Sequence, residues 1–211
     1  MDSSHPANAG PPDGGESITE AAFRAASDSA AAIRAASARA ASADRASDSG
    51  DALRVALSGW AAGVTLLTVA DGRDDIGTTV SAFMPLSLDP PLVAVSLIAG
   101  SYPAEVLSRP SLPAARFAVT LLSAAQKVIA GQFAAAGRPS ARLILDAVPH
   151  ARGATSDALI PFDGLAALEC SVARRVPAGD HLLVISAVEN VAYVSEAGDP
   201  LVRFRGRYPV L

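Results

Sequence analysis

Two long strand-like runs joined by a short turn constrain this chain more than any other feature. Residues 165–176 and 181–193 are rich in apolar and β-branched residues, and the sequence PAGD at residues 177–180 separates them. A glycine-containing connection of this length predicts a β-hairpin with antiparallel strands. Further strand-like runs lie at residues 64–70, 76–83, 92–98, 116–122 and 201–204.

Helical signals are few and short. Residues 51–60 place apolar side chains at helical spacing, with Trp60 as the expected core anchor, and Ser101 is a suitable cap for a second helix. Ser123 and Gln126 form a capping box for a third helix, which is expected to end near residue 133. Residues 137–164 show no clear period and are expected to form a long loop.

The order of these elements predicts the fold class. Strands do not alternate with helices, which argues against a doubly wound parallel sheet. Consecutive strands are mostly linked as hairpins, which favours an antiparallel barrel of Greek-key type. We therefore expect a mainly β domain with a few short helices.

The first 50 residues differ in composition from the rest of the chain. Residues 21–47 are mostly Ala, Ser, Arg and Asp, with only Phe23 and Ile33 as large apolar residues. Burial of this small apolar surface would not offset the conformational entropy lost on ordering the segment. We therefore expect a disordered tail at residues 1–50, with a partner-binding helix as the alternative. One globular domain is expected at residues 51–211.

The net charge argues against nucleic acid as a partner. The whole chain carries −4, and residues 1–50 hold seven acidic residues and four arginines, which leaves −1 for residues 51–211. A chain that binds nucleic acid usually has a strongly basic surface. The nearly neutral domain would instead tolerate self-association.

Other classes are disfavoured by residues that the chain lacks. Cys170 is the single cysteine, so no disulfide or cysteine-based metal site forms within the chain, and a reducing, cytoplasmic location is expected. With three histidines, a His-rich metal site is not expected, and no membrane segment or signal peptide is predicted. Walker A, G-x-G-x-x-G and G-x-S-x-G motifs are absent, so redox chemistry would need a bound organic cofactor.

Two features are candidates for binding such a cofactor. Residues 77–97, GTTVSAFMPLSLDPPLVAVSL, place Ser and Thr side chains where expected strands meet loops. These hydroxyls either satisfy orphan backbone groups or form the edge of a ligand site. His181 follows a turn and begins a strand, so its imidazole either bonds nearby backbone or contacts a ligand. Cys170 alternates with apolar residues and is expected in the core.

Five segments, in order, resemble the flavin reductase family, which comprises flavin-binding split-barrel proteins that act as reductase components of two-component monooxygenases. Residues 53–211 carry the resemblance. The segments are LRVALSGWAAGVTLLT from residue 53, GTTVSAFMPLSLDPPLVAVSL from residue 77, RFAVTLLSAAQKVIAGQFA from residue 116, LAALECSVARRVPAGDHLLVISAVENV from residue 165 and PLVRFRGRY from residue 200.

The resemblance implies a homodimeric, FMN-binding split barrel with the flavin near the subunit interface. It further implies reduction of FMN or FAD by NADH or NADPH, and a partner flavin-dependent monooxygenase that receives the reduced flavin. His181 is the implied catalytic residue, over the flavin face. The implied cofactor-binding residues are Thr78, Thr79, Val80 and Ser81 along the ring, Ser96, Leu97, Ile98, Ser101 and Tyr102 at the ribityl and phosphate end, Val119 and Thr120 on the neighbouring strand, and the closing Tyr208.

Some alternatives stay open at this point. Members of the family often have Asn where Thr120 stands and Arg where Tyr102 stands, so the preference between FMN and FAD is undecided. One alternative is a non-catalytic flavin-binding module. Another is an enzyme similar to pyridoxamine-phosphate oxidase, which would need basic residues around a phosphate, and residues 77–102 contain none.

Overall fold

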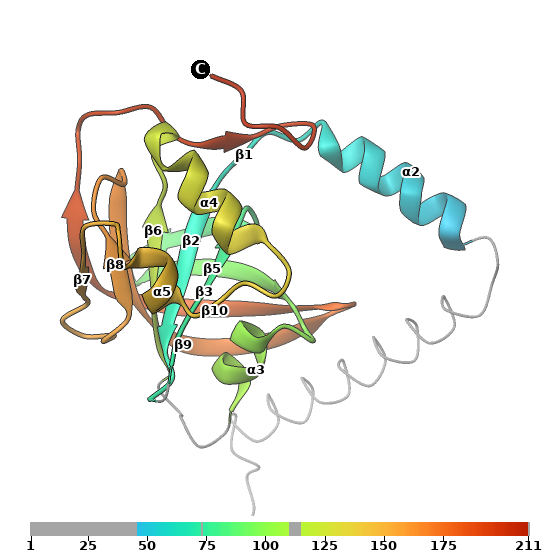
Figure 1. Ribbon diagram of the computed structural model, residues 1–211. Helices are drawn as coiled ribbons and strands as arrows, with labels where there is room; N and C mark the ends of the chain where they lie inside the picture. The colour runs from blue at the N-terminus through green and yellow to red at the C-terminus, as the bar shows by residue number, and fades with distance from the viewer. Residues whose placement is uncertain (1–45, 73, 110–114, 211) are drawn as a thin grey trace, which may run out of the picture.

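A curled antiparallel sheet of seven strands dominates the computed structural model, which describes residues 46–72, 74–109 and 115–210 (Figure 1). The sheet has the order β3-β2-β6-β9-β10-β5-β4. Two smaller pairs join β1 to β11 and β7 to β8. The strands of the large sheet are β2 (Thr65–Ala70), β3 (Asp75–Val80), β4 (Phe83–Leu88), β5 (Pro91–Ile98), β6 (Arg116–Leu121), β9 (Ala166–Ala178) and β10 (His181–Val194).

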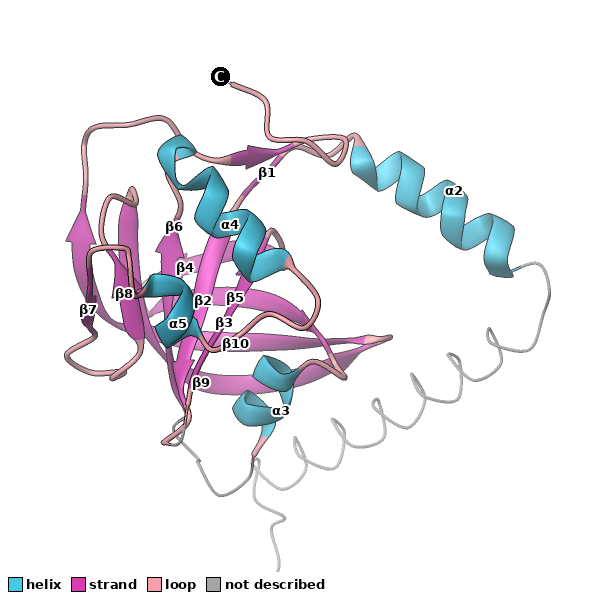
Figure 2. Cartoon of the chain, viewed as in Figure 1, coloured by secondary structure: helices cyan, strands magenta, loops and turns pink. Residues whose placement is uncertain are grey.

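The predicted hairpin is confirmed and organises the sheet. β9 and β10 pair antiparallel across the turn at Gly179 and Asp180, and Gly179 has φ +63°, which glycine adopts without strain. β6, β9 and β10 lie consecutively, and β5 returns beside β10. This is a Greek-key arrangement, so the predicted mainly β, antiparallel class is confirmed (Figure 2).

The prediction of a single strand at residues 76–83 is wrong in one respect, because this stretch belongs to two strands. β3 ends at Val80 and β4 begins at Phe83, and these strands form opposite edges of the large sheet. The chain crosses between the two edges at Ser81 and Ala82. The Ala82 carbonyl accepts a hydrogen bond from the Ser96 N–H of β5, so the curled sheet brings its two sides together at this crossing.

Two helix starts follow the predicted local signals. The Ser101 hydroxyl accepts a hydrogen bond from the Ala104 N–H and caps α3 (Tyr102–Ser108). Ser123 and Gln126 form the predicted capping box at η1 (Ala124–Gln126), which leads into α4 (Lys127–Ala134). α4 and α5 (Ala141–Leu145) pack against β3, and α3 packs against β3 and β5.

The core lies on both sides of the sheet. The larger cluster fills the inside of the curl, where Cys170 is fully buried among apolar side chains, as predicted. Burial raises the pKa of the Cys170 thiol to about 12, with smaller contributions from Glu189 and Glu169, so the thiol stays protonated and unreactive at neutral pH. The second cluster lies beneath α4 and α5 and includes Phe133.

The expected long loop at residues 137–164 is also wrong. This stretch contains α5, β7 (His150–Arg152) and β8 (Leu159–Pro161). Elements of three to five residues are too short to produce a detectable hydrophobic period.

The first helix departs most from expectation. α2 (Ala46–Ser58) begins before residue 51 and extends away from the sheet in Figure 1. All of residues 50–58 are exposed, and Trp60 is 75% exposed, so its expected role as a core anchor is wrong in the subunit. Residues 1–45 of the predicted tail lie outside the described residues. Within the described part, no helix is long and apolar enough to cross a membrane.

Candidate functional site

Two of the predicted cofactor-binding segments meet where the chain crosses from β3 to β4. The Ala82 carbonyl accepts from the Ser96 N–H at 2.9 Å. Ser81 is exposed, Ser96 is half-buried, and Val80 and Leu97 are buried beneath them. Hydroxyl and backbone groups of residues 78–82 and 96–101 therefore lie along one edge of the sheet. We call this edge, together with residues 180–181, the rim.

Thr78 and Thr79 lie on opposite faces of β3. Thr78 pairs with Leu67 and Thr79 pairs with Leu66, and paired residues of antiparallel strands share a face. Leu67 belongs to the core inside the curl, and Leu66 belongs to the core under α4. Both threonines are half-buried, so a flat ligand on one side of β3 meets only one of their side chains and otherwise meets backbone.

The hairpin tip completes the rim. His181 pairs with Ile98, and the Ala99 N–H donates to the Asp180 carbonyl at 3.0 Å. Ile98 is 63% exposed, so an apolar side chain stands beside the imidazole. The structure thus brings together predicted residues that are far apart in sequence.

His181 is held by its neighbour in sequence. The imidazole Nδ1 lies 2.7 Å from Asp180 Oδ1, and the His181 side chain is 39% exposed. This hydrogen bond and the charge of a protonated imidazole lower the pKa of the Asp180 carboxyl below its usual value. The contact engages Nδ1, so Nε2 is the ring nitrogen left for a ligand. Asp180 was not predicted as a site residue, although the Gly-Asp-His turn marked its position.

At the start of α3, the side chains are already engaged. The Tyr102 hydroxyl donates to Asp71 Oδ2 at 2.9 Å, and Arg109 Nη1 donates to Asp71 Oδ1 at 2.6 Å. Asp71 follows β2 and is distant in sequence, so no local pattern indicated this contact. The Ser101 hydroxyl is used as the helix cap.

Val119 and Thr120 do not reach the rim surface. They pair with Leu67 and Leu66 on β2, one strand behind Thr78 and Thr79, and their exposed fractions are 0% and 1%. The Thr120 hydroxyl is buried without a hydrogen-bond partner in the structure. These residues can support β2 and β3, but their side chains do not face solvent in the subunit.

Tyr208 also stands apart from the hairpin tip. It is half-buried and packs against the core under α4. The Lys127 ammonium lies 6.0 Å from its ring centroid, at the outer limit of a cation–π contact.

Comparison with known proteins decides the family. The profile of the flavin reductase like domain matches residues 57–211, most of the chain. The chain therefore belongs to the flavin reductase family. Among its relatives, an NADH-dependent FMN reductase of Streptomyces nodosus subsp. asukaensis is 33% identical over 169 residues, which cover 80% of this chain and 89% of the relative.

Other members of the flavin reductase family agree. The reductase component of 4-hydroxyphenylacetate 3-monooxygenase of Thermus thermophilus is 35% identical over 158 residues, covering 75% of this chain and 94% of the relative. A solved structure of a Streptomyces globisporus NADH:FAD oxidoreductase, in complex with NAD and FAD fragments, has a TM-score of 0.67 at 28% identity. That match covers 75% of this chain and 90% of the other.

The rim suits the ligand class of the flavin reductase family. A flavin has a flat apolar ring with polar edges, and the rim offers Ser81 and Ser96, the backbone of the crossing, exposed Ile98 and an imidazole. Two cavities of about 210 and 240 Å³, lined by residues that include Phe162 and Thr155, contain none of the predicted residues. At the rim itself, Ser81 and Ile98 are exposed in the subunit. Among the described residues, no cluster of His, Cys, Asp and Glu could hold a metal ion.

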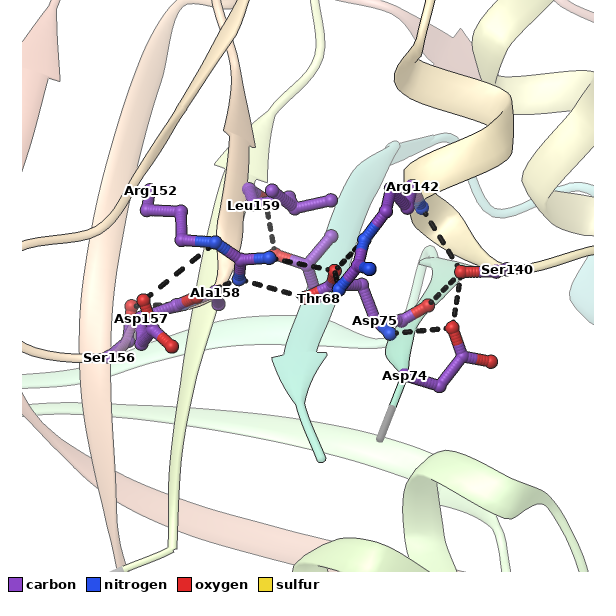
Figure 3. Close-up of polar contacts among 10 residues, drawn as sticks. All are labelled: Thr68, Asp74, Asp75, Ser140, Arg142, Arg152, Ser156, Asp157, Ala158 and Leu159. Carbon is purple, nitrogen blue, oxygen red and sulfur yellow. Dashed lines mark hydrogen bonds and ion pairs between the residues drawn. The ribbon is translucent and has the colours of Figure 1, made fainter. Parts of the chain in front are cut away.

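Two buried carboxylates near this sheet were missed by the sequence analysis. Asp75 on β3 accepts hydrogen bonds from Arg142 of α5 and Arg152 of β7, as Figure 3 shows. Glu169 on β9 accepts from the backbone of the β7–β8 loop and from Asn190. Both tie residues 138–164 to the sheet, so they act on the fold and do not reach the rim.

Proposed function

We propose that this chain is an NAD(P)H-dependent flavin reductase that transfers hydride to FMN or FAD and supplies reduced flavin to a partner monooxygenase. The observation that carries the proposal is the rim, where the β3–β4 crossing, the end of β5 and the Asp180–His181 tip lie side by side. Membership of the flavin reductase family supports the same activity. The single buried cysteine fits a cytoplasmic location.

Different groups of rim residues would bind the flavin ring, the ribityl chain and the nicotinamide. When bound, the flavin supplies the atom that accepts hydride, and the protein orients it. The backbone and hydroxyls of residues 78–81 would hold the ring, and Ser96, Leu97, Ile98 and Ser101 would line the ribityl end. Val119, Thr120 and Tyr208 would support the neighbouring strands from behind. His181 would stand at the open face, where nicotinamide has to stack close to the flavin.

The assay that tests this function follows the loss of NADH or NADPH absorbance after mixing the protein with FMN, FAD or riboflavin. Flavin-dependent oxidation at substoichiometric enzyme supports the proposal. A tightly bound flavin that neither nicotinamide reduces would instead support the non-catalytic module.

Changing His181 to Ala is expected to slow NADH oxidation roughly tenfold or more, because the nicotinamide would lose a group that positions it. Flavin affinity, measured by quenching of flavin fluorescence, should change less than about threefold, because most proposed flavin contacts come from β3 and β5. His150→Ala on β7 is the matched control and should leave both quantities unaltered. An equal loss of rate and affinity would contradict the role given to His181.

We also propose that the active form is a homodimer. α2 exposes Leu53 and Leu57, and Trp60 follows them at helical spacing, with exposed fractions of 58%, 61% and 75%. The edge strand β4 exposes Met84 and Leu88, the latter at 95%. Unpaired apolar patches of this kind mark interaction sites, and the near-neutral domain offers little charge repulsion to a second copy.

The double change Leu57→Ser and Trp60→Ser should weaken this dimer by at least about 100-fold, because two large apolar side chains would no longer be buried. Light scattering during size-exclusion chromatography measures the mass. Both side chains are exposed in the subunit, so thermal unfolding of the monomer should change little. Leu143→Ser, an equally exposed leucine on α5, is the control. A dimer that survives the double change would exclude this surface.

A further inference from the structure

The outer edge of β3, on the side away from β2, is partly covered by the connection between α4 and α5. Along an antiparallel strand, the backbone groups of alternate residues point to the same side. On this side the Asp75 carbonyl accepts from the Ser140 hydroxyl at 3.2 Å, as Figure 3 shows, and the Gly77 carbonyl accepts from Arg138 Nε at 2.6 Å. Thr79 is the next residue of this series, and in the part of the chain that the structure describes its outward backbone groups have no hydrogen-bond partner. The covered part of the edge thus ends at Arg138, directly before the rim.

Arg138 is held in this position by close packing of α4 on β3. A Cβ atom on Gly77 would overlap the ring of Phe133, so glycine is required where the helix meets the strand. Gly137, with φ +67°, turns the chain after α4, and Arg138 Nη1 makes a second, longer contact with the Ala135 carbonyl at 3.4 Å. The guanidinium is therefore fixed between β3 and the end of α4.

The Arg138 guanidinium carries a charge that no carboxylate of the described residues neutralises. Arg138 is half-buried, and burial lowers the pKa of its guanidinium below the usual value, but arginine stays protonated at neutral pH. None of the ion pairs within the described part of the chain includes Arg138, whereas Arg142 and Arg152 share Asp75. A half-buried cation without a countercharge is a cost to the fold, and such groups are concentrated at functional sites.

The rim lies within reach of this charge. Alternate residues of a strand are about 7 Å apart, so a ligand that bonds to the outward groups of Thr79 lies roughly that far from the Gly77 carbonyl that Arg138 contacts. This separation is shorter than the distance of about 8 Å over which physiological salt screens exposed charges. The Arg138 charge therefore acts on a ligand held at Thr79.

We infer that Arg138 belongs to the flavin site, where its guanidinium stabilises the negative charge that the flavin ring gains on reduction. The inference rests on the proposed function, in which residues 78–81 hold the ring. Hydride transfer breaks the C4–H bond of nicotinamide and forms an N–H bond on the flavin ring, so the nicotinamide gains one positive charge and the ring gains one negative charge. A fixed cation beside the ring favours the reduced form over the neutral, oxidised form and raises the midpoint potential of the bound flavin.

The experiment measures, without oxygen, the dissociation constants of oxidised FMN and of FMN reduced with dithionite in the full chain. Arg138→Gln removes the charge and keeps an amide donor for the Gly77 carbonyl. Reduced FMN should lose at least about tenfold in affinity relative to oxidised FMN, which for a two-electron couple corresponds to a midpoint potential about 30 mV lower. Arg138→Lys keeps the charge and should change this ratio less than about threefold. Arg174→Gln, which removes an exposed cation on β9, is the matched control.

A second variant and the pH dependence separate the charge from the packing of α4. Ala135→Glu leaves Arg138 in place and adds a carboxylate beside it, so the relative affinity for reduced FMN should fall here too. Loss of the cation should also raise the pKa of the reduced ring. The pH at which the slope of midpoint potential against pH changes should therefore be higher in Arg138→Gln than in the unaltered chain.

The outcomes distinguish this inference from the proposed function. An equal loss of affinity for oxidised and reduced FMN in Arg138→Gln, or no change in either, would overturn the inference and leave the proposed function intact, because Arg138 would then act only on the fold of β3. An unaltered chain that binds no flavin, or whose bound flavin neither NADH nor NADPH reduces, would reject the proposed function itself.

Discussion

Changing Glu169 to Ala should lower the free energy of unfolding by about 4 kcal/mol or more, a large share of the stability of an ordinary domain. The carboxylate is fully buried on β9. Its oxygens accept from Ala154, Thr155 and Ser156 N–H, from the Ser156 hydroxyl and from Asn190 Nδ2, at 2.7 to 3.2 Å. Alanine would leave the two Ser156 donors buried without an acceptor and would remove the acceptor of three part-buried donors. Urea denaturation measures the loss.

The pH dependence of the unfolding free energy distinguishes the contribution of the Glu169 charge from that of its packing. Burial alone would raise the pKa of Glu169, but hydrogen bonds from Asn190, Ser156 and Thr155 outweigh it and lower the pKa to about 2. A carboxyl whose pKa is lower in the folded state stabilises the fold above its unfolded pKa of about 4.5. That contribution, on the order of 3 kcal/mol, is lost as the pH falls toward 2.

Glu169→Gln tests this relation directly. The gap in unfolding free energy between the unaltered chain and this variant should shrink as the pH falls from about 5 to about 2. Glu196→Gln changes an exposed carboxylate and should cost less than about 0.5 kcal/mol at any pH. A gap that stays constant across this range would show that the Glu169 charge does not stabilise the fold.

Changing Asp75 to Asn should destabilise the domain by about 2 to 3 kcal/mol. Asp75 is 2% exposed and accepts from Arg142 Nε and Nη2 and from Arg152 Nη1 and Nη2, at 2.8 to 2.9 Å (Figure 3). Asparagine would leave the two guanidinium groups facing each other without the buried carboxylate that both of them contact. Both arginine side chains are more than one-third exposed, so water reduces the cost below that of a fully buried pair.

Asp157, a second carboxylate beside Arg152, provides the control. Asp157 lies 3.8 Å from Arg152 Nε but is 74% exposed, so Asp157→Asn should cost less than about 0.5 kcal/mol. Burial would raise the pKa of Asp75, but the hydrogen bonds and charges of the two arginines hold it below its usual value. The difference between the two variants should therefore fall as the pH drops below about 4. Equal costs at neutral pH would contradict this account.

Local patterns predicted the elements whose partners are near in sequence. The β9–β10 hairpin, the capping box at Ser123 and the cap at Ser101 each depend on residues within a few positions, and all three are present. The buried carboxylates depend on long-range contacts instead. Asp75 and Arg152 are 77 positions apart, so Asp75 looks in the sequence like an ordinary turn aspartate.

The same distinction applies to the site and to Trp60. The rim joins Ser81, Ser96 and His181, whose meeting depends on how the sheet curls, so spacing alone left it open and the family resemblance indicated it. Helical spacing identified an apolar stripe that ends at Trp60, but it does not say whether the stripe packs on its own domain or on another surface. In the subunit, Trp60 is 75% exposed and belongs to none of the three core clusters.

The crossing at Ser81 and Ala82 links the two edges of the sheet through a single stretch of chain. A ligand held there contacts the connection between β3 and β4 and also β5, to which Ala82 is hydrogen-bonded. Separation of the sheet edges would break the ligand contacts. Loss of the ligand would in turn remove contacts that hold the two edges together. Flavin binding at the crossing and the free energy of local opening of the sheet edges are thus thermodynamically linked. A flavin that binds weakly enough to be released to a partner would therefore stabilise the contact between the edges only weakly.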